Sequence, residues 1–84
     1  MPVLSRFYGI LIRMYFQQAE HNPPHVHAQY GDYVAAVSIQ TGEVLDGQLP
    51  PKALMMVKKW IGIHRDDLIQ IWETQEFRTL SPLE

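Results

Sequence analysis

The sequence predicts an α+β fold, in which an antiparallel sheet of three or four strands packs one face against a C-terminal helix or kinked helix pair. The first half of the chain has apolar residues at alternate positions, which is typical of half-buried strands. Glycine-containing turns separate these stretches, and the last third changes to helical apolar spacing. With 84 residues, the chain is expected to form one domain over 1–84.

The first expected strand covers about residues 7–17. One set of alternate positions in it is wholly apolar: Tyr8, Ile10, Ile12, Met14 and Phe16. The other set is mixed and contains Phe7, Leu11 and Arg13. Because successive side chains on a strand point to opposite faces, the first set is expected to face the core.

A hairpin is expected next, with strands at about 25–30 and 33–40 joined at Gly31 and Asp32. Pairing outward from this turn sets Val26 opposite Val37 on one face and His27 opposite Ala36 on the other. A shift of one residue would mix the two faces, so this register is favoured. His25 and His27 then point to the same side, away from the core.

A short fourth strand is expected at about 43–47, and a helix at about 50–78 that begins at the paired prolines Pro50 and Pro51. Its apolar stripe alternates spacings of three and four: Leu54, Val57, Ile61, His64, Leu68 and Ile71. Gly62 is the expected place for a kink or a break. The expected core places the following sheet residues against this stripe: Tyr8, Ile10, Ile12, Val26, Tyr30 and Val37.

Composition narrows the classes of function. The chain has no cysteine, which excludes disulfides and thiolate chemistry and fits a reducing cytoplasm. Its net charge of −2 gives no global attraction to nucleic acid. The longest apolar stretch is interrupted by Arg13 and is too short to span a bilayer, so no membrane contact is expected. No secretion signal is recognisable either, and a cytoplasmic protein is expected.

The candidate site is the segment His21–His27, which holds three of the four histidines beside a paired proline. Histidine is the commonest metal ligand, so His21, His25 and His27 could bind zinc or a similar divalent transition metal. Alternatively, His25 and His27 could act as general base and general acid, with Arg13 holding a phosphate. In a third interpretation the imidazoles only satisfy loop carbonyls and lock the turn.

A second candidate surface is the sheet face opposite the helix, because the sequence offers no second helix to cover it. The expected contact residues on this face are Phe7, Leu11, Val34 and Ala36. An 84-residue monomer has little other material to cover such a face, so self-association is expected.

Several stretches resemble the bacterial family called domain of unknown function 4160. They are Ser5–Ile10, His21–His27, Tyr30-Gly31, Gly42–Gly47 with Leu49-Pro50, Trp60, His64-Arg65 and Trp72. The family typically has phenylalanine in place of Val26, which is a conservative difference. The resemblance implies a small protein without an assigned activity, often encoded beside another small protein in a two-gene module of toxin–antitoxin type. It therefore implies that neighbour-encoded protein as a partner and, more weakly, a ribonuclease-like toxin that acts on RNA.

Overall fold

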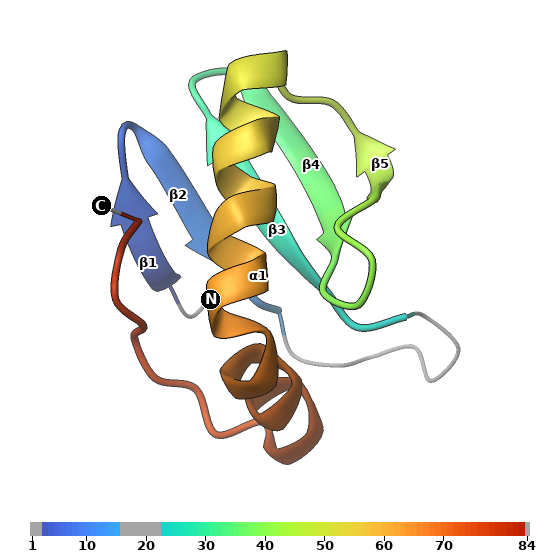
Figure 1. The fold of residues 1–84 in the computed structure, drawn as a ribbon, viewed down its shortest axis with the longest axis vertical. Helices are drawn as coiled ribbons and strands as arrows, with labels where there is room; N and C mark the ends of the chain where they lie inside the picture. The colour runs from blue at the N-terminus through green and yellow to red at the C-terminus, as the bar shows by residue number, and fades with distance from the viewer. Residues whose placement is uncertain (1–2, 16–22, 84) are drawn as a thin grey trace.

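The computed structural model describes residues 3–15 and 23–83 and shows five antiparallel strands and one helix (Figure 1). The strands lie side by side in chain order: β1 (Val3–Phe7), β2 (Ile10–Arg13), β3 (His25–Tyr30), β4 (Tyr33–Ser38) and β5 (Val44–Gly47). The helix is α1 (Pro51–Thr74), which crosses one face of the sheet. The α+β class is confirmed, but the expected three or four strands are five.

The additional strand comes from a turn inside the first expected strand. Tyr8 and Gly9 both have positive φ angles, 49° and 80°, as a two-residue hairpin turn requires. Phe7 therefore pairs with Ile10, and both side chains are buried in the core. The expected strand over 7–17 is wrong at its start, because the apolar alternation continues through the turn. It is also wrong near its end, because β2 ends at Arg13 and the described residues 14 and 15 are not in a strand, while residues 16 and 17 lie outside the described residues.

The hairpin of β3 and β4 has the expected register. Val26 lies opposite Val37, and His27 lies opposite Ala36. Both valines are fully buried against the helix side of the sheet. β4 ends at Ser38, slightly before the expected residue 40, although the Ile39 amide still donates to a carbonyl at the start of β3, that of Pro24, at 3.0 Å.

Helix α1 begins at the paired prolines as expected and ends earlier than residue 78. Gln75 adopts a left-handed conformation with φ of 60° and caps the helix by donating its backbone N–H to the Ile71 carbonyl. The irregular backbone lies at His64 (φ −106°, ψ 16°), two positions after the expected Gly62. No helix among the described residues combines the length and the apolar character that a membrane span needs.

The residues after α1 run back along β1 as an extended tail (Figure 1). The Leu80 amide donates to the Leu4 carbonyl at 2.7 Å, and the Ser81 carbonyl accepts hydrogen bonds from Trp60 Nε1 at 2.8 Å and His64 Nε2 at 2.9 Å. The tail thus covers the outer edge of β1. His64 lies at the boundary of the core, where its ring is hydrogen-bonded to the tail.

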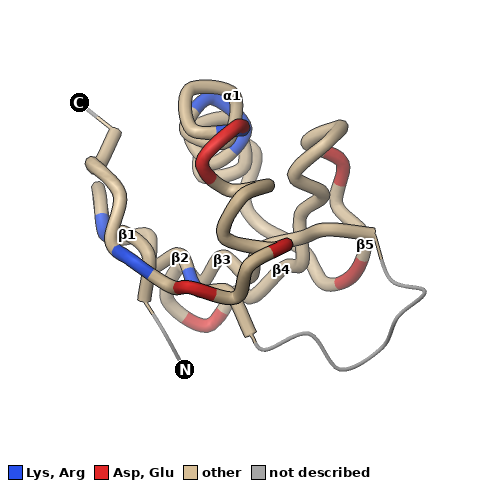
Figure 2. Tube along the Cα trace, turned by 90° about the horizontal axis from the view of Figure 1, so that it is seen from below, with Lys and Arg blue, Asp and Glu red and all other residues tan. Residues whose placement is uncertain are grey.

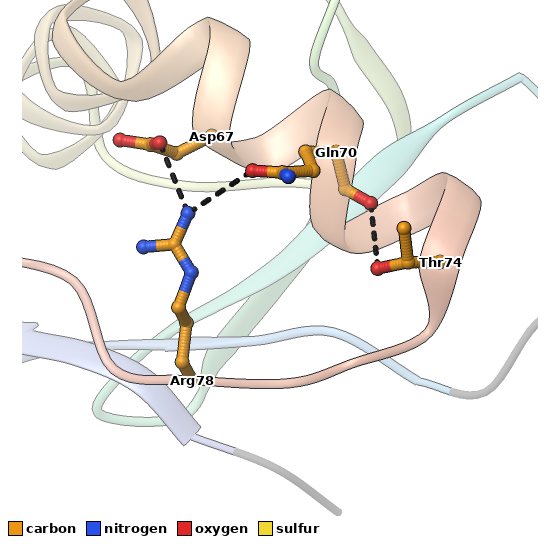
Figure 3. A network of polar contacts seen from close by, with 4 residues as sticks. All are labelled: Asp67, Gln70, Thr74 and Arg78. Atoms are coloured by element: carbon orange, nitrogen blue, oxygen red, sulfur yellow. Dashed lines mark hydrogen bonds and ion pairs between the residues drawn. The ribbon is translucent and has the colours of Figure 1, made fainter.

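A polar network links the same tail to the end of α1 (Figure 3). Arg78 Nη2 donates to Asp67 Oδ1 at 3.0 Å and to Gln70 Oε1 at 3.4 Å. Thr74 Oγ1 donates to the Gln70 carbonyl at 2.9 Å. The ion pair is about half exposed, so it is worth less than about 1 kcal/mol.

The core lies between the sheet and α1, and Figure 2 shows the helix on one side of the sheet only. The prediction of a core position is wrong for two residues. Tyr8 is 60 % exposed and Tyr30 is 38 % exposed, because both sit at hairpin ends. Leu54 is only partly buried. The core residues that the sequence did not assign to the core include Leu4, Phe7 and Ile39.

Candidate functional site

A row of four residues crosses the sheet face opposite α1. Arg13 of β2 pairs with His27 of β3, His27 pairs with Ala36 of β4, and Ala36 pairs with Asp46 of β5. Residues that lie opposite each other in antiparallel strands project to the same face, so these four side chains share one surface. The structure therefore brings a cation, an imidazole and a carboxylate into one line from three different strands.

His25 lies beside His27, as its position two residues earlier on β3 predicts. Their ring centroids are 5.1 Å apart, and the His25 ring also lies 5.2 Å from the Trp72 ring of α1. His25 Nδ1 is 2.9 Å from the Pro23 carbonyl oxygen. A carbonyl only accepts hydrogen bonds, so Nδ1 carries the proton. In the neutral ring, Nε2 is then left with a free lone pair.

Beside these side chains, on the open face of the sheet, lies a hollow of about 320 Å³, called the histidine hollow below. Its lining residues are Pro23, His25, His27, Ala36, Leu45 and Asp46. Leu45 is an additional residue in β5, since Asp46 lies opposite Ala36 while Val44 lies opposite Val37. This bulge places Leu45 and Asp46 together at the wall of the histidine hollow.

The environment of His27 favours the neutral imidazole. Burial lowers the pKa of His27 from its ordinary value of 6.5, and the charge on His25 lowers it further, while Asp46 opposes both effects. The Tyr15 ring stands edge-on against the His27 ring at 4.3 Å. His27 Nδ1 is buried and has no hydrogen-bond partner among the described residues. A proton on His27 is thus poorly accommodated in the folded chain.

This shift predicts that acid destabilises the protein. The folded state holds the His27 pKa below the unfolded value of 6.5, so the unfolded chain binds more protons in the window below that value. The contribution of neutral His27 is complete above pH 6.5 and is lost as the pH falls below it. Thermal melts between pH 7.5 and pH 5.5 should show a falling Tm.

Two variants isolate His27 in these melts. His27→Gln should show a weaker fall in Tm, because the titrating group is gone. Asp46→Asn should show a stronger fall, because Asp46 is the group that raises the His27 pKa. An identical fall in the parent protein and in His27→Gln would contradict the assignment.

The other predicted site residues are only partly brought together. Arg13 shares the row with His27, but its guanidinium donates to Gln29 Oε1 at 3.5 Å and does not line the histidine hollow. His21 lies outside the described residues. Within residues 3–15 and 23–83, no three His, Asp or Glu side chains are grouped closely enough to hold a metal ion. Zinc binding through His21, His25 and His27 stays a prediction.

The four expected contact residues separate into two groups. Leu11 and Val34 belong to a neighbouring row on the open face, linked through Gln29, and Val34 is 47 % exposed. Ala36 forms part of the histidine hollow. Phe7 is in the core, with its ring 5.8 Å from the Trp60 ring, so its expected place on the open face is wrong. The early turn at Tyr8 and Gly9 reverses the face on which Phe7 lies.

Asp46 is the site residue that the sequence did not identify. It lies within a stretch that carries the family resemblance, but regular pairing of β5 with β4 from Val44 and Val37 onward would set Leu45, and not Asp46, opposite Ala36. The bulge at Leu45 makes that register impossible to count from the sequence alone, since one additional residue moves every later side chain to the other face.

Comparisons with known proteins agree with the resemblance seen in the motifs. The model of the family described as Domain of unknown function (DUF4160) matches residues 9–73, which include the histidines of β3, the whole of β5 and most of α1. No curated protein matches the chain, and no solved structure matches it. The matched segment spans most of the sequence, and the chain belongs to the DUF4160 family.

Proposed function

We propose that this chain is the protein-interaction component of a cytoplasmic, bacterial two-gene module of toxin–antitoxin type, with the His21–His27 segment as its functional surface. The observation that supports this best is the open face of the sheet. Among the described residues, the only helix packs against the opposite face and meets the open face only where Trp72 lies against His25. The open face combines the histidine hollow with exposed Val34. A surface with both apolar and polar anchors is typical of a protein contact.

The proposed partners are a second copy of this chain and the small protein encoded beside it. The tail occupies the edge of β1, where the Leu80 amide bonds to Leu4, so that edge is closed to strand addition. The open face has no such cover from the described helix, and it carries Leu11, Val34 and Ala36. Association through this face would bury its apolar side chains against the partner, as happens where two sheets pack face to face.

The test is co-expression with the neighbour-encoded protein, followed by sedimentation velocity and calorimetric titration of the purified pair. The variant carries His25→Gln and His27→Gln together. We expect it to fold with a loss of less than about 1.5 kcal/mol, which is the scale of the ring contact between His25 and Trp72. It should bind the partner at least about tenfold more weakly, as loss of a contact worth about 1.4 kcal/mol implies.

His64→Gln is the matched control, because it makes the same chemical change at a histidine that bonds to the tail. It should retain partner binding. If the double variant melts as low as a core variant, these histidines are structural and the site is wrong. If it folds and binds normally, the functional surface lies elsewhere.

A histidine-dependent ribonuclease is the second candidate. The free lone pair on His25 Nε2 favours it, because a general base needs an exposed lone pair that can accept a proton. His27, with its ring centroid 5.1 Å away, would complete the pair of catalytic imidazoles, and Arg13 would hold the phosphate. Incubation of the purified chain with single-stranded RNA tests this. Cleavage that the double variant abolishes and His64→Gln retains would favour the enzyme over the interaction module.

A further inference from the structure

The histidine hollow exists because Ala36 is small. Ala36 sits between His27 and Asp46 in the row across the sheet, and its methyl group is too short to fill the space between those longer side chains. It is only 9 % exposed although it lies outside the core cluster that α1 covers. The neighbouring side chains therefore enclose it, and they leave a walled space above it.

Two of the polar groups that line this space offer hydrogen-bond acceptors. His25 Nδ1 donates to the Pro23 carbonyl, so the neutral ring presents an accepting Nε2. The Asp46 carboxylate makes no hydrogen bond or ion pair within the part of the chain that the structure describes. Burial favours the neutral His27 imidazole, and Asp46 supplies a carboxylate at the wall of the hollow.

The nearest cation in the row does not neutralise this charge. Arg13 is separated from Asp46 by His27 and Ala36, and its guanidinium donates to Gln29 instead. The remaining walls, Pro23 and Leu45, are apolar. A ligand that fits must bring hydrogen-bond donors, a positive charge, a flat group that stacks on imidazole and an aliphatic part.

We propose that the histidine hollow accepts an arginine side chain from a partner protein. A guanidinium is planar and always charged, carries five N–H donors and stacks on aromatic faces, while its aliphatic stem packs on apolar walls. Lysine meets the charge but neither the planar geometry nor the stacking. A phosphate needs donors, and the Asp46 carboxylate repels it. This inference rests on the proposed interaction function and names the chemistry of its contact.

The test is an NMR titration of the isotope-labelled protein with N-acetyl-arginine amide. The imidazole C–H signals of His25 and His27 and the backbone signal of Asp46 should shift together and saturate. The citrulline analogue has the same shape without the charge, and it should bind about three- to fivefold more weakly, the scale of an exposed charge pair. The lysine analogue should also bind more weakly than arginine.

Two variants and two controls locate the binding. Asp46→Asn should weaken arginine binding by about three- to fivefold, whereas Asp32→Asn should not, since it removes an exposed charge in the turn between β3 and β4. Ala36→Leu should fill the hollow and abolish the shifts. Val34→Leu, on the same strand and face but outside the lining, should retain them.

Equal binding of arginine and citrulline would overturn the inference, as would an unchanged affinity in Asp46→Asn. Inorganic phosphate that shifts the same histidine signals would also overturn it and point to a nucleic-acid site. These outcomes are independent of the partner titration. Suppose that the double histidine variant loses partner binding, but N-acetyl-arginine amide does not bind the parent protein. The interaction function then stands, and only the arginine contact is refuted.

Discussion

Replacing Gly47 by alanine is expected to lower the free energy of unfolding by roughly 2–5 kcal/mol, combining about 1–2 for left-handed backbone strain with about 1–3 for overpacking. Gly47 closes β5 opposite Ala35 and has a φ of 77°. A Cβ at this position would lie 2.1 Å from the Val34 carbonyl oxygen and 3.0 Å from the Ala35 Cα. Both neighbours are backbone, so neither can turn aside.

Gly31→Ala is the control that measures the backbone strain of a positive φ without a steric clash. Gly31 also has a positive φ, 58°, but a Cβ there would meet no atom within 4 Å. It should therefore cost only about 1–2 kcal/mol. Urea unfolding of both variants measures the difference. Equal losses would contradict the prediction, because they would mean that β5 moves away from β4 at little cost. Since β5 carries Leu45 and Asp46, Gly47→Ala should also disturb the histidine hollow.

The register of the hairpin of β3 and β4 could be predicted because its information is local. The turn at Gly31 and Asp32 fixes the register, and the alternation of apolar and polar residues on both strands agrees with it. The shared face of His25 and His27 follows from that register alone. This part of the site therefore needed no tertiary information.

The first hairpin could not be predicted in the same way, because the same alternation fits one long strand or two strands around a tight turn. Phe7 and Ile10 occupy opposite faces in the first case and the same face in the second. The deciding feature is the positive φ at Tyr8, which is uncommon for a residue other than glycine. In the sequence, Gly9 is the only residue that indicates a turn at this position.

Other features depend on contacts between distant segments. The helix ends at Gln75, a residue type without special preference for the left-handed cap, and the tail then returns to β1. The contact between His25 and Trp72 joins residues from β3 and the end of α1. Neither the spacing of residues nor the composition predicts these contacts, because they follow from how the helix lies across the sheet.

The second large effect is expected for Trp60→Ala, which should cost about 3–5 kcal/mol, the usual loss for a buried aromatic residue. Trp60 is fully buried, packs near Phe7 and His64, and donates its indole N–H to the Ser81 carbonyl. The change therefore removes the centre of the core and one of the bonds that hold the tail.

Trp60→Phe distinguishes these two roles, since it keeps an aromatic ring and loses the N–H donor. Trp72→Phe is the matched control, because Trp72 is also buried but its indole donates no hydrogen bond among the described residues. Hydrogen exchange at the Leu80 amide, which bonds to Leu4, reports on the tail. It should accelerate in Trp60→Phe by about fivefold or more, as loss of a bond worth about 1 kcal/mol implies. Equal acceleration in Trp72→Phe would mean that general core loosening, and not the bond to Ser81, controls the tail.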